Sequence, residues 1–251
     1  MHNTLYWIDY FNSNLKNERI DWSIQPVLAI SEKQNILKSL QAWQLGETSE
    51  GTSLVKAATK HAKLFNHPYY TDAIKLFIKE EQKHGNNLGH YIDLIGEQRI
   101  KKDWGDSLFR KIRGLNTHME FWTIAVITVE STAQIFYQCL KDATKCKLLK
   151  QICTDILIDE AAHITFQIER LSLLYNSKNA FMKVVSYYFY TIFYFSTTLV
   201  VWFAHKRLFK AGKVNFSKYL MRMKLKFKRT IKKLKPETQN INVENTCSHL
   251  L

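Results

Sequence analysis

Apolar residues recur every three or four positions along four long stretches of the chain, and this spacing predicts amphipathic helices. The stretches cover residues 31–65, 68–95, 107–141 and 145–175. Residues 123–129 are rich in β-branched side chains, but the helical pattern on both sides favours a helix there too. The chain has 251 residues with only 8 Gly and 3 Pro, too few turn-forming residues for a protein of many short strands. We therefore expect an all-α protein.

Two further helices are predicted after these stretches. Residues 184–204 carry no charge and are apolar or aromatic on nearly every side, which predicts an additional apolar helix. A basic amphipathic C-terminal helix follows at about residues 214–234, where one apolar stripe runs along a cationic helix. The stripe consists of Phe216, Leu220, Met223, Phe227, Ile231 and Leu234.

The predicted elements divide the chain into four parts. We expect a lead-in at residues 1–30 and a four-helix bundle at 31–178. The apolar helix and the basic helix follow at 179–235, and a disordered tail occupies 236–251.

The charge of the chain is concentrated in one segment. Its 36 Lys and Arg against 22 Asp and Glu give a net charge of +14, but 13 of the basic residues lie in 205–235, which has no acidic residue. We expect residues 205–235 to bind an anionic membrane surface. Nucleic acid is a less favoured partner, because the aromatic residues of this segment lie mostly on the apolar stripe, where they cannot stack on bases.

Residues 184–204 are long enough to cross a bilayer as a helix. The basic segment after them would stay in the cytoplasm by the positive-inside rule, which would place the N-terminal domain outside. We therefore favour a helix that packs on the bundle or lies in a membrane surface over a single transmembrane span. The four cysteines form no CxxC pair, and residues 1–10 show no secretory pattern. We expect a cytoplasmic protein, peripheral on the inner membrane face.

Acidic residues and histidines recur at a spacing that suits metal ligands. Glu81 precedes His84 by three positions, and Glu160 precedes His163 by three, so each pair lies on one helix face about a turn apart. Glu130 interrupts an apolar run, where a buried carboxylate needs a partner such as a metal ion.

The first predicted helix offers a further carboxylate. Glu50 is the candidate ligand there, and Glu47, one turn earlier, is the alternative. The choice between the two rests on their spacing along the sequence alone. We expect Glu80 to be a surface acid. Tyr91 and Tyr137 lie near the proposed ligand faces and are expected to pack in the core, as are Cys139, Cys146 and Cys153.

This series of carboxylates and histidines resembles the ferritin-like di-iron carboxylate proteins. In that family an antiparallel four-helix bundle presents one Glu from each of two helices and Glu-x-x-His from each of the other two. The resemblance implies two iron ions, with manganese as an alternative. The implied ligands are Glu50, Glu81, His84, Glu130, Glu160 and His163. It also implies that Asp159, directly before Glu160, accepts a hydrogen bond from a ligand histidine.

The resemblance implies an oxidoreductase that activates O₂ or peroxide, and the apolar helix indicates an apolar small-molecule substrate. Leu88 stands where the small subunit of ribonucleotide reductase keeps its radical tyrosine, so radical storage is not expected. Three alternatives stay open: a ferroxidase or metal-handling protein, a tRNA-modifying hydroxylase that uses the basic segment, and a metal-free membrane-associated scaffold. The sequence identifies no electron donor.

Overall fold

The structure is a computed structural model that describes residues 1–114 and 118–234, and within these residues it contains helices and no β-strand. The helices are α1 (Thr4–Asn14), α2 (Ile30–Glu47), α3 (Thr52–Leu64), α4 (Tyr70–Leu94), α5 (Trp104–Gly114), α6 (Met119–Ala143), α7 (Lys147–Asn176), α8 (Ala180–Ala211) and α9 (Phe216–Leu234). The predicted all-α fold is confirmed. The predicted disordered tail at 236–251 lies outside the described residues.

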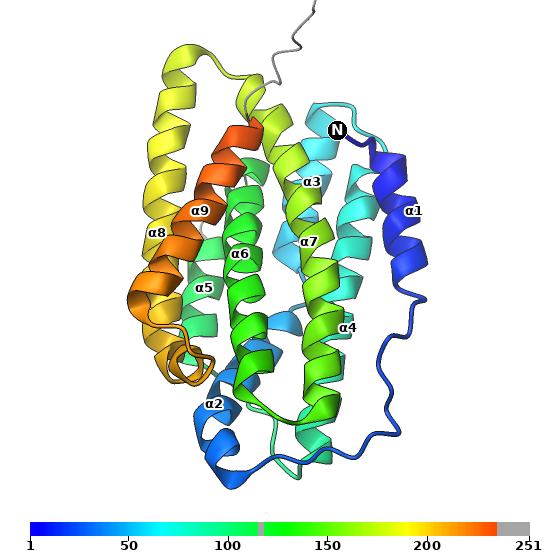
Figure 1. Cartoon of the computed structure of the whole chain (residues 1–251). Coiled ribbons are helices and arrows are strands. Elements are labelled where there is room, and N and C mark those ends of the chain that lie inside the picture. The colour runs from blue at the N-terminus through cyan, green and yellow to red at the C-terminus, as the bar shows by residue number, and fades with distance from the viewer. Residues whose placement is uncertain (115–117, 235–251) are drawn as a thin grey trace, which may run out of the picture.

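A bundle of long helices forms the centre of the molecule (Figure 1). α6 and α7 pack along each other, α2 packs on α4, and α4 contacts α7. α6 is buried on nearly all sides, because α7 and α8 both pack against it. The β-branched run at 123–129 is therefore helical, as expected, and its side chains fill the interior of the bundle.

The first predicted helix is interrupted. The continuous helix expected over 31–65 is divided into α2 and α3 by residues 48–51. Gly51 sits at this break with a φ of +63°, and a Cβ there would lie 2.5 Å from Ile78 Cδ1. Only glycine combines this left-handed backbone with such close packing on α4. The break places Glu47 at the end of α2 and leaves Glu50 in the connection.

The N-terminal lead-in contains a regular helix that packs on the bundle. Asn3 caps α1, its side chain accepting a hydrogen bond from the Tyr6 amide. Trp7 and Phe11 are buried, and the Trp7 indole donates to Glu169 of α7 at 2.8 Å. α1 also contacts α4, so it covers the outer side of these two bundle helices.

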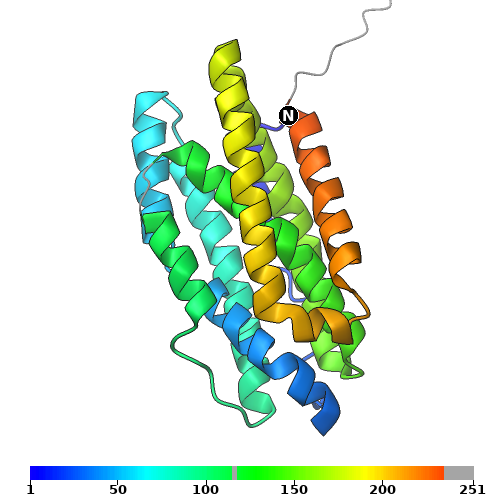
Figure 2. The same cartoon turned by 90° about the vertical axis from the view of Figure 1, so that its left-hand side faces the viewer.

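α8 lies along the outside of the bundle, with α9 beside it (Figure 2). Over residues 186–202 its buried residues fall at every fourth position and face inward: Ser186, Tyr190, Tyr194, Thr198 and Trp202. By length and composition α8 could cross a membrane, but it is here packed on α6 along one face.

The apolar stripe of the basic helix faces the protein, so the stripe itself is not free to enter a membrane. In α9, Met223 is 0% exposed, Phe227 5% and Leu234 1%, and the helix packs on α6, α7 and α8. Packing on its own bundle buries the apolar stripe and leaves the basic side chains exposed, except for Lys226, which donates to Gln134 of α6.

Candidate metal centre

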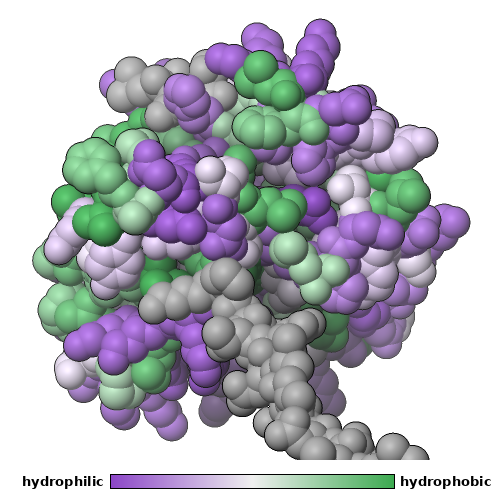
Figure 3. All heavy atoms as spheres, turned by 90° about the horizontal axis from the view of Figure 1, so that it is seen from above, coloured by the Kyte–Doolittle hydropathy of each residue, from purple (hydrophilic) through white to green (hydrophobic). Residues whose placement is uncertain are grey.

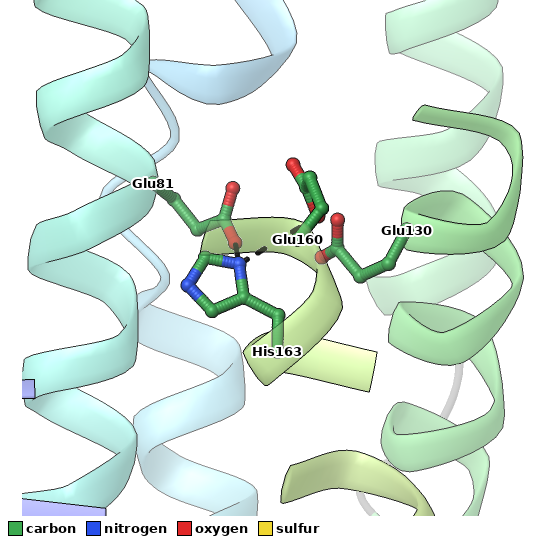
Figure 4. Close-up of side chains that lie close together, drawn as sticks. All are labelled: Glu81, Glu130, Glu160 and His163. Carbon is green, nitrogen blue, oxygen red and sulfur yellow. Dashed lines mark ion pairs between the residues drawn. The ribbon is translucent and has the colours of Figure 1, made fainter. Parts of the chain in front are cut away.

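Six side chains from four helices converge in the interior of the bundle. Glu81, Glu130, Glu160 and His163 each offer a ligand atom within 4.8 Å of the others, and so do Glu47, Glu81 and His84. The first group is drawn in Figure 4. Glu81 belongs to both groups, so the centre consists of two adjoining sites.

Glu81 and Glu160 lie between the two histidines. His163 Nδ1 is 2.8 Å from Glu81 Oε1 and 3.6 Å from Glu160 Oε2. His84 Nδ1 is 3.8 Å from Glu81 Oε2 and 3.9 Å from Glu160 Oε1. Each of these carboxylates therefore reaches both halves of the centre with its two oxygens, which is the position of a bridging ligand.

Both histidines turn Nε2 away from the centre, toward another buried carboxylate. His84 Nε2 lies 3.0 Å from Asp159 Oδ2, as the resemblance implied for Asp159. His163 Nε2 lies 2.7 Å from Glu80 Oε2. Glu80 is 0% exposed, so the expectation of a surface acid was wrong. Both carboxylates can accept a hydrogen bond from the Nε2–H group and so direct the Nδ1 lone pair toward the centre.

Asn14 and Arg19 fix these outer carboxylates. The Asn14 side-chain amide donates to Glu80 Oε1 at 2.7 Å and to Asp159 Oδ1 at 2.8 Å. Arg19 donates to Asp159 and Asp155, and to Asn14 Oδ1 at 3.0 Å. The chain around α1 therefore closes the outer side of the centre and fixes the orientation of both histidines.

Glu47, the alternative candidate, replaces Glu50 as the carboxylate from the first bundle helix. Its Oε1 accepts hydrogen bonds from Tyr137 Oη at 2.7 Å and Trp43 Nε1 at 2.9 Å. Glu50 is exposed and belongs to neither group of ligand atoms. The structure leaves Glu50 outside the centre for a local reason, because α2 ends at Glu47 and the helical spacing used to place Glu50 does not continue past it.

The crowding of carboxylates changes their ionisation. Burial raises the pKa of Glu47 well above its usual range, and the negative charges of Glu81 and Glu160 raise it further. Burial likewise raises the pKa of Glu130, again with contributions from Glu160 and Glu81. Without metal, these two groups tend to hold protons that a cation would displace.

The histidines respond in the opposite sense. Burial alone would lower the pKa of His84, but the hydrogen bond to Asp159 and the nearby Glu81 and Glu160 hold it well above its usual value. For His163, burial is outweighed by Glu81, Glu160 and Glu80, so its pKa is also raised. Protons on these rings neutralise part of the carboxylate charge.

The inner atoms of the centre lack the hydrogen bonds that buried polar atoms normally make. Among the described residues, Nδ1 of His84 and both oxygens of Glu160 have no hydrogen-bond partner, and His163 Nδ1 and Glu81 Oε1 have none beyond their own 2.8 Å contact. Such a cluster is costly unless a cation occupies it. The oxygen-rich donor set with two imidazoles fits iron or manganese better than zinc, which takes fewer ligands.

A cavity of about 690 Å³ adjoins the centre. Glu47, Glu81 and Glu130 line it, and so do apolar side chains that include Val126 of α6 and Val200 of α8. The cavity therefore offers a bound apolar molecule direct access to the carboxylates.

Sequence reasoning missed Glu80, Asn14 and Arg19. Glu80 could have been found, because residues 80–84 read Glu-Glu-x-x-His and residues 159–163 read Asp-Glu-x-x-His. In both helices the acidic residue before the Glu of the centre contacts the Nε2 atom of a histidine on the other helix. Asn14 and Arg19 carry no such signal, since their contacts to Asp159 join residues 145 and 140 positions apart.

Solved structures of R2-like ligand-binding oxidases share this fold. One variant with an aerobically reconstituted Mn/Fe cofactor matches with a TM-score of 0.61 and 16% identity, over 93% of this chain and 94% of that chain. An R2-like ligand-binding oxidase with aerobically reconstituted Mn/Fe cofactor (long soak) matches with a TM-score of 0.56 and 16% identity, over 93% and 92%. No family model and no curated protein matches the sequence. The likeness confirms the ferritin-like bundle predicted from the ligand pattern.

Proposed function

We propose that the protein is a di-metal oxidoreductase that holds two iron ions, or one manganese and one iron, and uses O₂ or peroxide to oxidise an apolar small molecule. The observation that carries the proposal is the pair of adjoining ligand groups that share Glu81. The Mn/Fe cofactor in the names of the structurally similar oxidases supports it.

The chain's own residues account for the holding of two cations. Glu81 and Glu160 lie between the histidines and would bridge the metals, while Glu47 and Glu130 would each bind on one side. Bound iron or manganese would supply the redox chemistry with O₂. Tyr137 and Trp43 fix Glu47 through hydrogen bonds, which limits its movement when the charge of the centre changes.

The cavity supports an apolar substrate. Its walls bring apolar side chains of α4, α6 and α8, among them Phe77, Val126 and Val200, beside the predicted ligands Glu47 and Glu130. The part of a molecule that lies against these apolar walls would be shielded from water, which favours oxidation of the substrate over loss of oxidising equivalents to solvent. A ferroxidase that stores iron needs no such apolar cavity.

Metal analysis of the full chain tests the proposal. Protein purified without oxygen and incubated with Fe(II), or with equimolar Mn(II) and Fe(II), should hold two metal ions per chain after desalting. Exposure to O₂ should consume oxygen and change the absorbance without further iron uptake. A folded protein that retains no metal would overturn the proposal, and progressive iron accumulation would show a ferroxidase instead.

A further inference from the structure

We infer that the outer face of α8 and α9 docks on an anionic lipid bilayer, with both helices lying along the membrane surface. The apolar part of this face is the outward side of α8, where the side chains of Ile192, Phe203 and Tyr188 are 68%, 63% and 61% exposed. Phe181, Val184 and Val185 extend the same exposed side toward the start of the helix. Seen from above, hydrophobic side chains gather along the edge of the molecule where α8 lies (Figure 3). This inference is independent of the metal centre.

Basic side chains border the apolar side. The exposed surface of α9 includes Lys218, Arg222, Lys224, Lys228, Arg229, Lys232 and Lys233. Two apolar side chains, Met221 at 55% and Leu225 at 48% exposure, lie among these cations. Residues 170–234 contain no Asp or Glu, so no acidic side chain of α8 or α9 offsets the charge. Exposed apolar side chains flanked by Lys and Arg suit the interface of an anionic bilayer, where lipid headgroups meet acyl chains.

The positive charge of this face favours an anionic bilayer over a second copy of the chain as its binding partner. An isologous dimer through this face would bring two sets of α9 cations together, and like charges at close range oppose association. Nucleic acid would satisfy the cations but would leave the aliphatic side chains of α8 in water. An anionic bilayer satisfies both parts of the face.

The inner side of α8 favours surface docking over a transmembrane span. The Tyr190 and Ser186 hydroxyls both donate to Glu120 Oε1 of α6, and Lys178 pairs with the same oxygen at 2.6 Å. Tyr194 Oη donates to the Met223 carbonyl of α9 at 3.2 Å. A span would have to break these contacts, whereas surface docking keeps them.

Docking would also fix the distance between the cavity and the membrane surface. Thr197, Val200, Val201 and Ala204 of α8 line the cavity beside the predicted ligands, while Leu199 and Phe203 of the same turns are exposed. The thickness of α8 alone therefore separates the cavity from the docking face.

Flotation of the full chain with lipid vesicles tests the inference. Vesicles of phosphatidylcholine with about 30% phosphatidylglycerol should carry the protein upward in a density gradient, while pure phosphatidylcholine vesicles should not. Raising the salt from about 0.05 M to about 0.5 M should release most of it, because ions screen the attraction. Alkaline carbonate should extract it fully.

Two double variants locate the face. Ile192→Ser with Phe203→Ser should weaken binding roughly tenfold by removing exposed apolar surface. Its control is Val27→Ser with Ile30→Ser, since these side chains are 76% and 78% exposed but lie elsewhere. The control should bind like the unmodified chain.

Lys224→Glu with Lys228→Glu should weaken binding at least tenfold, because each basic residue near the surface contributes roughly fivefold. Lys56→Glu with Lys60→Glu is the control, as both lysines are exposed on α3 and the net charge change is the same. Circular dichroism confirms that each variant folds.

Four results would overturn the inference. The first is equal flotation with neutral and anionic vesicles, and the second is equal binding by both double variants and their controls. The third is resistance to carbonate extraction. The fourth is an unmodified chain that is a dimer and that the Ile192→Ser and Phe203→Ser variant converts to a monomer. The third would show a transmembrane span, and the fourth would identify the face as a subunit interface.

Discussion

The imidazole rings of His84 and His163 lie 5.7 Å apart between centroids, and both direct Nδ1 toward the same two carboxylates. They come from α4 and α7, whose local sequences place an outer acidic residue, a Glu of the centre and a His of the centre at equal spacing. The two halves of the centre are thus built alike, and a change in either outer carboxylate should affect the nearer half first.

Replacing Asp159 with Asn should weaken metal binding roughly 10- to 100-fold, because His84 would lose the carboxylate that orients its ring. Glu80→Gln should have a similar effect through His163. Competition with a chromophoric chelator measures the affinity for Mn(II) and Fe(II). Asp72→Asn, at an exposed position near the start of α4, is the control. Equal affinities in all four proteins would show that the outer carboxylates do not support the ligands.

Glu47→Gln should leave about one tightly held metal per chain, since the group formed by Glu47, Glu81 and His84 loses a charged ligand. Glu50→Gln should still hold two, because Glu50 is exposed and outside both groups. Inductively coupled plasma mass spectrometry after desalting gives both numbers. Two metals in Glu47→Gln and one in Glu50→Gln would instead identify Glu50 as the ligand.

The metal-free protein should lose stability as the pH rises from about 6 to about 8. Glu47, Glu130, His84 and His163 have pKa values raised by folding. Their stabilisation is complete below the pKa of the unfolded chain and is lost as the pH rises through the folded pKa. Asp159 and Glu81 have lowered pKa values, so their contribution changes only in more acidic solution.

Urea unfolding of chelator-treated protein at both pH values measures this loss. Metal-loaded protein should show a weaker or opposite trend, because bound cations keep the carboxylates ionised. Glu130→Gln should reduce the pH dependence of the free energy of unfolding of the metal-free protein. An unchanged or greater free energy of unfolding at about pH 8 would contradict the prediction.

Gly212→Ala should destabilise the protein by about 1–3 kcal/mol, because a Cβ there would lie 2.6 Å from the Cys139 carbonyl oxygen of α6. Gly212 connects α8 to α9, so the loss reports on their packing against the bundle. Gly46→Ala is the control, since its Cβ would meet nothing within 4 Å and alanine favours the helix by about 0.5–1 kcal/mol. Equal stability of the two variants in thermal unfolding would contradict this packing.

The repeated acid-x-x-His pattern was enough to predict the bundle and four of the six converging residues, because helical spacing alone places Glu81 with His84 and Glu160 with His163. Glu130 was identified by its apolar neighbours. The first ligand helix could not be fixed in the same way, since the break after Glu47 depends on Gly51 meeting Ile78 of another helix.

The α9 stripe shows a second limit of sequence patterns. Its periodicity correctly predicted an amphipathic helix, but an apolar stripe looks the same whether lipid or protein covers it. Burial of Met223 and Phe227 shows that protein covers the stripe. The exposed apolar side chains of α8 were predicted only as part of an apolar segment, with no indication of which side faces outward.

Asn14 and Asp159 are separated by 145 positions, yet they share a hydrogen bond beside the centre. During synthesis α1 leaves the ribosome long before α7, so the frame around the histidines cannot close until nearly two thirds of the chain has been made. Metal offered to a nascent chain that ends before His163 would meet an incomplete ligand set. Loading of the centre is therefore a late event, tied to the docking of the first helix on the last helix of the bundle.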